Sequence, residues 1–129
     1  MFTYTKNNFK MKKTLIIGAS TNPDRYAYQA AHMLTKKGHP IINIGVKQGE
    51  VAGVKIEMLG VPYQDVDTVT LYIGKDLQQN YVDYLLATKP KRVIFNPGTE
   101  NPVLQKLLIQ NQIEAFEACT LVLLSTGQF

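Results

Sequence analysis

The sequence predicts an α/β protein with a Rossmann-like, open, mainly parallel sheet of about five strands and helices on both faces. Short runs of β-branched and aliphatic residues alternate along the chain with segments that carry apolar residues at helical spacing, which is the pattern of repeated βαβ units. Several of these runs end at a glycine, as at Gly18, Gly45 and Gly74, where a strand can turn into the next segment. The length of 129 residues fits a single domain.

Six segments have the composition of β-strands. Four form the core of the expected sheet, one shorter piece falls in a glycine-punctuated connection, and one lies near the end of the chain. The piece in the connection is expected as a short turn or strand. The expected ranges are 14–17, 41–44, 54–56, 69–73, 92–95 and 113–116.

Four helical segments are expected, and three of them begin with a recognisable start signal. Asn22 followed by Pro23, and Asn101 followed by Pro102, match an N-cap residue and a proline at the first helical position. Asp76 is expected to cap the helix between these two. The second helix is expected to stop at Thr88 and Pro90. The expected ranges are 23–37, 77–88, 102–108 and 120–124.

The second helical segment carries an apolar stripe of Leu77, Tyr81, Tyr84 and Leu85. This spacing predicts that the four side chains share one face of the helix and pack on the sheet. The two tyrosines are therefore expected to serve packing or a dimer surface rather than catalysis.

The net charge of +4 taken alone would suggest an acidic partner such as a nucleic acid or a membrane surface. Four of the 14 basic residues, however, are the lysines of the first 13 residues, which leaves 10 basic against 10 acidic residues in the rest of the chain. We interpret residues 1–11 as a loose leader and residues 12–129 as the folded domain. No nucleic-acid or membrane partner is expected.

A cytoplasmic location is expected from two features. The single cysteine, Cys119, cannot form an internal disulfide, and the start of the chain lacks the apolar stretch of a secretory signal. No run of residues reaches the ~18 to 20 consecutive apolar positions that a membrane-spanning helix needs. The oligomeric state is open, with a homodimer as the default for a small assembly.

In an open parallel sheet, ligands bind beyond the carboxyl ends of the strands. The strand assignment therefore selects four loops, 18–25, 45–47, 72–75 and 96–100, together with the first turn of the helix that follows the first loop. The candidate cofactor-binding residues are Gly18, Ala19, Ser20, Asn22, Pro23, Arg25, Tyr26, Gly45, Val46, Lys47, Tyr72, Ile73, Gly74, Asn96, Pro97 and Gly98.

The first loop carries the clearest ligand chemistry. It combines a glycine turn, the Ser20 hydroxyl and the amino end of a helix, whose free N–H groups favour an anion. Arg25 and Tyr26 add a cation and a flat ring. An ordinary strand-to-helix turn would also need Gly18, so a purely structural role stays open.

The loop departs from the dinucleotide-binding pattern G-x-G-x-x-G, because no further glycine occurs between Gly18 and Gly38. The second strand also ends in Gly45-Val46-Lys47, without the acidic residue that would bind the ribose diol of NAD. A lysine at this point suits a phosphorylated ribose instead. The residues therefore favour coenzyme A or NADP over NAD.

At these positions the chain resembles the small stand-alone coenzyme A-binding domain proteins, relatives of the N-terminal domain of the succinyl-coenzyme A synthetase alpha subunit. The resemblance spans residues 12–129. It is carried by Gly18-Ala19-Ser20 with Pro23, Arg25, Tyr26 and Ala27, by the 69–73 strand, and by Asn96-Pro97-Gly98-Thr99-Glu100-Asn101. It implies a Rossmann-like fold in which Gly18, Ala19, Ser20, Pro23, Arg25 and Tyr26 contact the phosphates and nucleotide of coenzyme A.

No catalytic residue set and no metal site are predicted. His32 and His39 do not follow a strand, and the acidic pair Asp65 and Asp67 precedes one, on the side away from the expected ligand. No helix start or base is identified beside Cys119, so a buried structural cysteine is expected. Asn96 and Glu100 have an alternative role as caps of the next helix.

We therefore expect a coenzyme A or acyl-coenzyme A binding module with a regulatory or carrier role, and enzymatic activity is not expected. Two alternatives stay open. One is an NADP-binding reductase or redox-sensing module, and the other is a protein-interaction domain that has lost its ligand.

Overall fold

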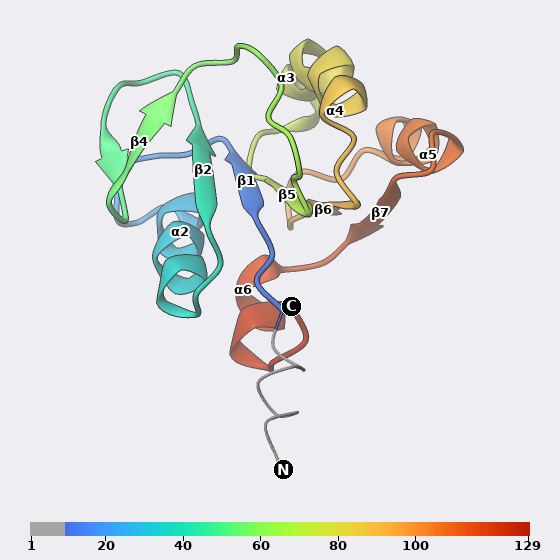
Figure 1. The fold of residues 1–129 in the computed structure, drawn as a ribbon. Coiled ribbons are helices and arrows are strands. Elements are labelled where there is room, and N and C mark those ends of the chain that lie inside the picture. Colours follow the sequence, from blue (N-terminus) through green and yellow to red (C-terminus); the bar gives the residue numbers. More distant parts are fainter. Residues whose placement is uncertain (1–9) are drawn as a thin grey trace.

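The computed structural model describes residues 10–129, and in this range seven strands form one sheet (Figure 1). The strand order is β3-β4-β2-β1-β5-β6-β7. All neighbouring strands pair in parallel except β3 and β4, which form an antiparallel hairpin. The strands are β1 (Thr14–Ile17), β2 (Ile41–Ile44), β3 (Glu50–Val51), β4 (Val54–Glu57), β5 (Thr68–Leu71), β6 (Arg92–Phe95) and β7 (Glu114–Glu117).

The fold class is confirmed, while the sheet has seven strands rather than about five. The additional strand, β3, pairs with β4 through a tight turn in which Ala52 and Gly53 have φ angles of 53° and 79°. Two left-handed residues in succession are typical of hairpin turns that usually carry asparagine and glycine. Because the first of these positions is an alanine, the sequence lacks the usual asparagine–glycine signal for this turn. The third core strand also ends at Leu71 instead of residue 73.

The helices of the described residues lie between and after the strands. They are α2 (Tyr26–Lys36), α3 (Lys75–Gln78), the 3₁₀ helix η1 (Gln79–Tyr81), α4 (Val82–Thr88), α5 (Pro102–Gln110) and α6 (Thr120–Ser125). The start predicted for α5 is confirmed, since the Asn101 side chain accepts a hydrogen bond from the Leu104 N–H at 3.2 Å and Pro102 is the first helical residue.

The starts predicted for the other two helices are wrong. Asn22 does not cap α2, because its side chain accepts a hydrogen bond from the Asp24 N–H at 3.0 Å and its carbonyl accepts one from Arg25, closing a turn before the helix begins at Tyr26. Asp76 does not cap α3, because Gly74 is the N-cap and places Asp76 inside the first turn. There its carboxylate faces the positive end of the helix dipole.

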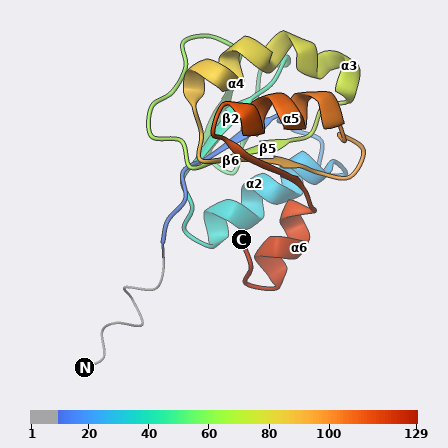
Figure 2. The same ribbon diagram turned by 90° about the vertical axis from the view of Figure 1, so that its right-hand side faces the viewer.

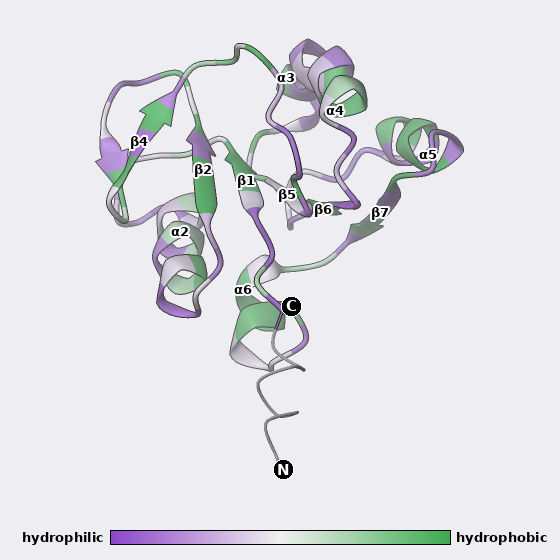
Figure 3. Cartoon of the chain, in the orientation of Figure 1, coloured by the Kyte–Doolittle hydropathy of each residue, from purple (hydrophilic) through white to green (hydrophobic). Residues whose placement is uncertain are grey.

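The sheet separates two apolar cores, because alternate residues of a strand point to opposite faces. Leu15 and Ile17 pack with α4 and α5, whereas Ile16 packs with α2 and α6. Figure 2 shows α2 and α6 together on one side of the sheet and α3, α4 and α5 on the other. Figure 3 shows hydrophobic and hydrophilic stretches on the same helix in α4 and α5, as expected for helices that cover one face of a sheet.

At the amino end of the sheet, Phe129 packs against the apolar core that α2 and α6 share with the sheet. Its backbone oxygen accepts hydrogen bonds from Lys12 and, at 2.8 Å, from Arg92, whose guanidinium lies 4.5 Å from the centre of the Phe129 ring. The His39 ring lies 5.0 Å from the same ring. Figure 1 shows the C-terminal end beside the segment that leads into β1.

Most of the predicted leader, residues 1–9, lies outside the described residues, so its loose structure stays a prediction. Lys12 belongs to the fold, since its N–H donates a hydrogen bond to His39 Nδ1 at 3.0 Å. Within residues 10–129, no helix is long and apolar enough to cross a membrane.

Candidate functional site

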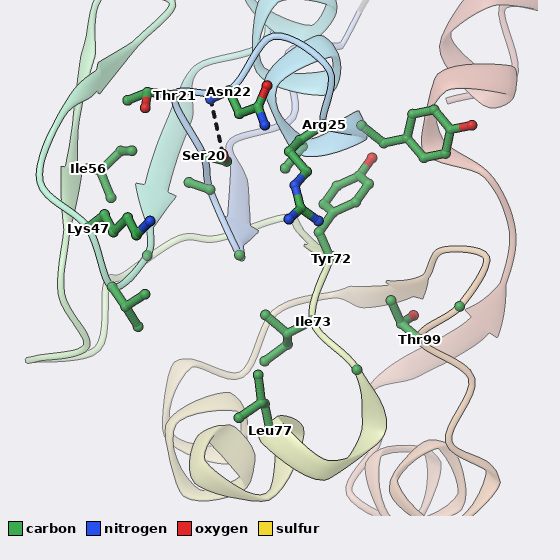
Figure 4. A pocket seen from close by; sticks show the side chains of 18 of the residues that line it. Ser20, Thr21, Asn22, Arg25, Lys47, Ile56, Tyr72, Ile73, Leu77 and Thr99 are labelled. Carbon is green, nitrogen blue, oxygen red and sulfur yellow. Dashed lines mark hydrogen bonds between the residues drawn. The ribbon is translucent and has the colours of Figure 1, made fainter.

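A cavity of about 720 Å³ opens at the carboxyl ends of the central strands (Figure 4). From β1 the chain continues to β2 on one side and later to β5 on the other, so β1 is the point at which the strand order reverses. Ligand sites of α/β sheets occur at such a point. The volume lies within the roughly 300–1,000 Å³ typical of small-molecule sites.

Nearly all of the predicted cofactor-binding residues line this cavity. The exceptions are Pro23 and Asn96. The predicted residues that line the cavity are Gly18, Ala19, Ser20, Asn22, Arg25, Tyr26, Gly45, Val46, Lys47, Tyr72, Ile73, Gly74, Pro97 and Gly98. The fold therefore brings together residues from four loops that are up to 80 positions apart in the sequence.

Asn96 does not line the cavity, and it does not cap α5, the helix that follows it. Its side chain is buried in the core, where Nδ2 donates to Thr70 Oγ1 at 2.7 Å and to the Leu71 carbonyl at 2.8 Å. Its Oδ1 accepts from the Thr120 N–H at 2.8 Å. Asn96 thus joins β6 to β5 and to α6. Glu100 is not a helix cap either, since it accepts the Gly98 N–H at 3.0 Å.

The amino end of α2 lies on the wall of the cavity. Tyr26 and Ala27, the first residues of this 11-residue helix, line it, and the N-cap residue Arg25 makes no side-chain capping bond. The first N–H groups of a helix have no partner within the helix. The turn closed by Asn22 delays the helix start to Tyr26, which places the amino end of α2, with the positive end of its dipole, at the cavity wall.

Two glycines allow the loops to close together below the cavity. A Cβ on Gly18, whose φ is +97°, would lie 3.0 Å from the Tyr72 carbonyl oxygen. A Cβ on Gly45 would lie 2.7 Å from the Ala19 carbonyl oxygen. Only glycine fits at both positions, and the backbones can therefore approach closely. The loops after β1, β2 and β5 pack against one another on this side of the cavity.

Arg25 and Lys47 are the cations of the cavity wall. Both are exposed, they lie on the segments after β1 and β2, and neither forms an ion pair with another of residues 10–129. Ser20 lies on the same side, where its Oγ accepts the Asn22 N–H at 3.1 Å. Figure 4 shows Arg25 and Lys47 on opposite sides of Ser20. This part of the cavity offers two unpaired cations and helix N–H groups to an anion.

Tyr72 forms part of the wall with its ring, and its hydroxyl is buried. No residue of the described chain lies in hydrogen-bonding geometry to Oη. Burial raises the pKa of Tyr72 to about 12. Tyr72 is thus a neutral phenol at any physiological pH.

Several lining residues were not predicted as site residues. Leu77 and Tyr81 were assigned to the apolar stripe, of which only Tyr84 and Leu85 are buried; Leu77 is 57% exposed and lies on the cavity wall. Tyr81 is partly buried, and it packs against the core cluster that contains Tyr84 and Leu85 while also lining the cavity. The remaining additions are Thr21, Asp24, Ala27, Ile56, Asn80 and Thr99.

Cys119 is partly exposed and is the N-cap residue of α6, so the expectation of a cysteine away from any helix start is wrong. The strand that precedes it ends at Glu117, which leaves Cys119 at the first residue before the helix. Cys119 is not among the residues that line the cavity.

Comparisons with known proteins agree with this fold. A crystal structure of an uncharacterized protein has 51% sequence identity and a TM-score of 0.91, over 94% of this chain and 100% of that chain. A hypothetical protein from Pyrococcus horikoshii OT3 has 25% identity and a TM-score of 0.78, over 88% and 81% of the two chains. A protein from Thermus thermophilus, at 20% identity and a TM-score of 0.80 over 92% and 91%, shares the fold.

No curated protein is significantly similar to this chain. The model of the CoA binding domain family matches residues 12–125, which include every residue of the cavity wall. The chain belongs to the family of CoA binding domains.

Proposed function

We propose that this protein binds coenzyme A or an acyl-coenzyme A in the cavity at the carboxyl end of the sheet, as a module with a regulatory or carrier role. The observation that carries the proposal is the amino end of α2, which lies on the cavity wall together with Arg25 and Lys47, two cations that form no ion pair within residues 10–129. Membership of the CoA binding domain family supports the same ligand.

The cations and the helix amino end fit the phosphates of coenzyme A. The N–H groups of Tyr26 and Ala27, with the Arg25 guanidinium, suit a diphosphate. Lys47 lies after the neighbouring strand and suits a phosphate on the ribose. The segment 45–47 carries no acidic residue for a free ribose diol, which disfavours NAD.

NADP also carries a ribose phosphate, and Lys47 is the observation that keeps it as a second candidate. An NADP-dependent reductase would need a group that positions a substrate beside the nicotinamide. The family match favours coenzyme A over NADP.

We propose binding without catalysis because of the carboxylate and hydroxyl groups that the cavity wall carries. Among the cavity residues of the described chain, the one carboxylate is Asp24, and it stands on the exposed turn before α2 rather than in the interior. The hydroxyl of Thr99 already donates to the Asn96 carbonyl at 2.8 Å. The cytoplasmic location and the homodimer stay predictions.

The test is a thermal-shift panel with coenzyme A, acetyl-coenzyme A, NADP, NAD and ATP. A ligand at about 100 times its dissociation constant stabilises the protein by about 2.7 kcal/mol. Coenzyme A species should raise the melting temperature, and the variant Arg25→Gln with Lys47→Gln should lose this shift. Lys36→Gln, at an exposed position on the last turn of α2, is the matched control and should keep it.

A shift with NADP alone would favour the second candidate. The absence of a shift with every nucleotide would favour the interaction domain that has lost its ligand.

A further inference from the structure

The two ends of the cavity differ in chemistry. Arg25 and Lys47 line the end at β1 and β2, whereas the end at β5 and β6 is lined by Ile73, Leu77 and Tyr81 together with neutral polar groups. A phosphorylated ligand would therefore place its charged part at the first end. Whatever it carries at its other end would meet an apolar wall.

The cavity is long enough to separate these two parts. Its lining extends from Ile56 on β4, across β2, β1 and β5, to Thr99 after β6. Adjacent strands lie about 4.8 Å apart, so four strand spacings give a length of about 19 Å. An elongated ligand with its phosphates beside α2 would thus direct its far end toward α3.

Leu77 is the most conspicuous residue of this far end. It lies on α3, is 57% exposed, and borders the cavity instead of packing in the core. Figure 4 shows the Leu77 and Ile73 side chains pointing toward one another at the lower side of the cavity. An exposed apolar group within a cavity is stabilised when an apolar part of a ligand covers it.

From this arrangement we propose that the ligand is a coenzyme A thioester with a short aliphatic acyl group, and that the acyl group contacts Leu77 and Ile73. This inference rests on the proposed function. Free coenzyme A ends in a thiol and would leave most of the Leu77 side chain in water. A chain of a few methylene groups would cover it.

The test compares the dissociation constants of coenzyme A, acetyl-coenzyme A and butyryl-coenzyme A by calorimetric titration. Each fully buried methylene adds roughly a fourfold gain in affinity, which follows from about 0.8 kcal/mol per CH₂. Butyryl-coenzyme A has two more methylene groups than acetyl-coenzyme A and should therefore bind up to about 16-fold more tightly. Leu77→Ser should reduce this ratio to less than about threefold.

The matched control is Val103→Ser, because Val103 is 81% exposed on α5 and does not line this cavity. This variant should keep the wild-type ratio. Equal affinities for the three compounds, or a Leu77→Ser variant that keeps the wild-type ratio, would overturn the acyl proposal and leave the proposed function standing. Failure of all three compounds to bind would instead overturn the proposed function, and this inference with it.

Discussion

The α-carbon of Gly18 lies directly against the backbone of Tyr72, so that a Cβ at position 18 would lie 3.0 Å from both the carbonyl carbon and the carbonyl oxygen of Tyr72. This contact joins the loop after β1 to the loop after β5. It therefore sets how closely the two walls of the cavity approach one another.

Gly18→Ala should destabilise the fold through two effects. The left-handed backbone at φ +97° costs an L-residue roughly 1–2 kcal/mol, and overpacking against Tyr72 adds about 1–3 kcal/mol. Gly98→Ala is the control, since Gly98 has φ +92° and no atom within 4 Å of the added Cβ. Urea unfolding should show the larger loss for Gly18→Ala; equal losses would contradict the close contact.

Asn96 is predicted to be a stability residue. Asn96→Ala removes three buried hydrogen bonds and leaves the Thr120 N–H and the Leu71 carbonyl without partners. We expect a loss of about 2–4 kcal/mol in urea unfolding. Asn111→Ala is the control, because its bond to the Leu107 carbonyl is exposed, and a loss below about 1 kcal/mol is expected. Similar losses in the two variants would refute the role assigned to Asn96.

The sequence predicts the strands and the site loops well because both depend on local pattern and on the parallel topology. Helix starts were less predictable, as the two Asn-Pro pairs show. Asn101 caps α5, whereas Asn22 closes a turn and the helix begins four residues later. The local signal is the same in both. The difference lies in the hydrogen bonds, because the Asn22 side chain accepts the Asp24 N–H two residues on, whereas the Asn101 side chain accepts the Leu104 N–H in the first turn of the helix.

Asn96 and Leu77 show a second limit of prediction from the sequence. The sequence predicts Asn96 as a ligand-binding residue and Leu77 as part of a buried stripe, whereas the structure buries the Asn96 side chain away from the cavity wall and exposes Leu77 on it. Whether a residue at the end of a strand points into the core or into the cavity depends on packing by distant elements, here α6 for Asn96. That information is not present in the spacing of neighbouring residues.

Tyr72→Phe should leave stability unchanged or raise it by up to about 1 kcal/mol. The Tyr72 hydroxyl is buried without a hydrogen-bond partner in the described residues, and removing such a group relieves the cost of its desolvation. Tyr63→Phe is the comparison, because the Tyr63 hydroxyl donates to Glu57 Oε1 at 2.7 Å and its loss should cost about 0.5–1.5 kcal/mol. A cost above 1 kcal/mol for Tyr72→Phe would mean that the Thr70 or Thr120 hydroxyl bonds it.

Because His39 is buried, we predict that the free energy of unfolding depends on pH. Burial, with the charges of Lys12 and Arg92, lowers the pKa of His39 below its usual 6.5. The unfolded chain then binds the proton first, so the free energy of unfolding should be at its full value above about pH 6.5 and should fall as the pH decreases below it. Protonation of Nδ1 would also remove the acceptor of the Lys12 N–H.

Urea unfolding at pH 7.5 and 5.5 measures this effect. Wild type should lose stability between the two values more steeply than His39→Gln. His32→Gln, at an exposed position on α2, should behave as wild type. Parallel losses in wild type and His39→Gln would exclude His39 as the titrating group.

The most direct test of the account is a calorimetric titration of the wild-type protein and of the Arg25→Gln, Lys47→Gln variant with coenzyme A. We predict one site per chain for wild type and an affinity at least tenfold lower for the variant, whose circular dichroism should be unchanged. Absence of coenzyme A binding to the wild type, or equal affinity in the two proteins, would contradict the assignment of the anion site at the amino end of α2.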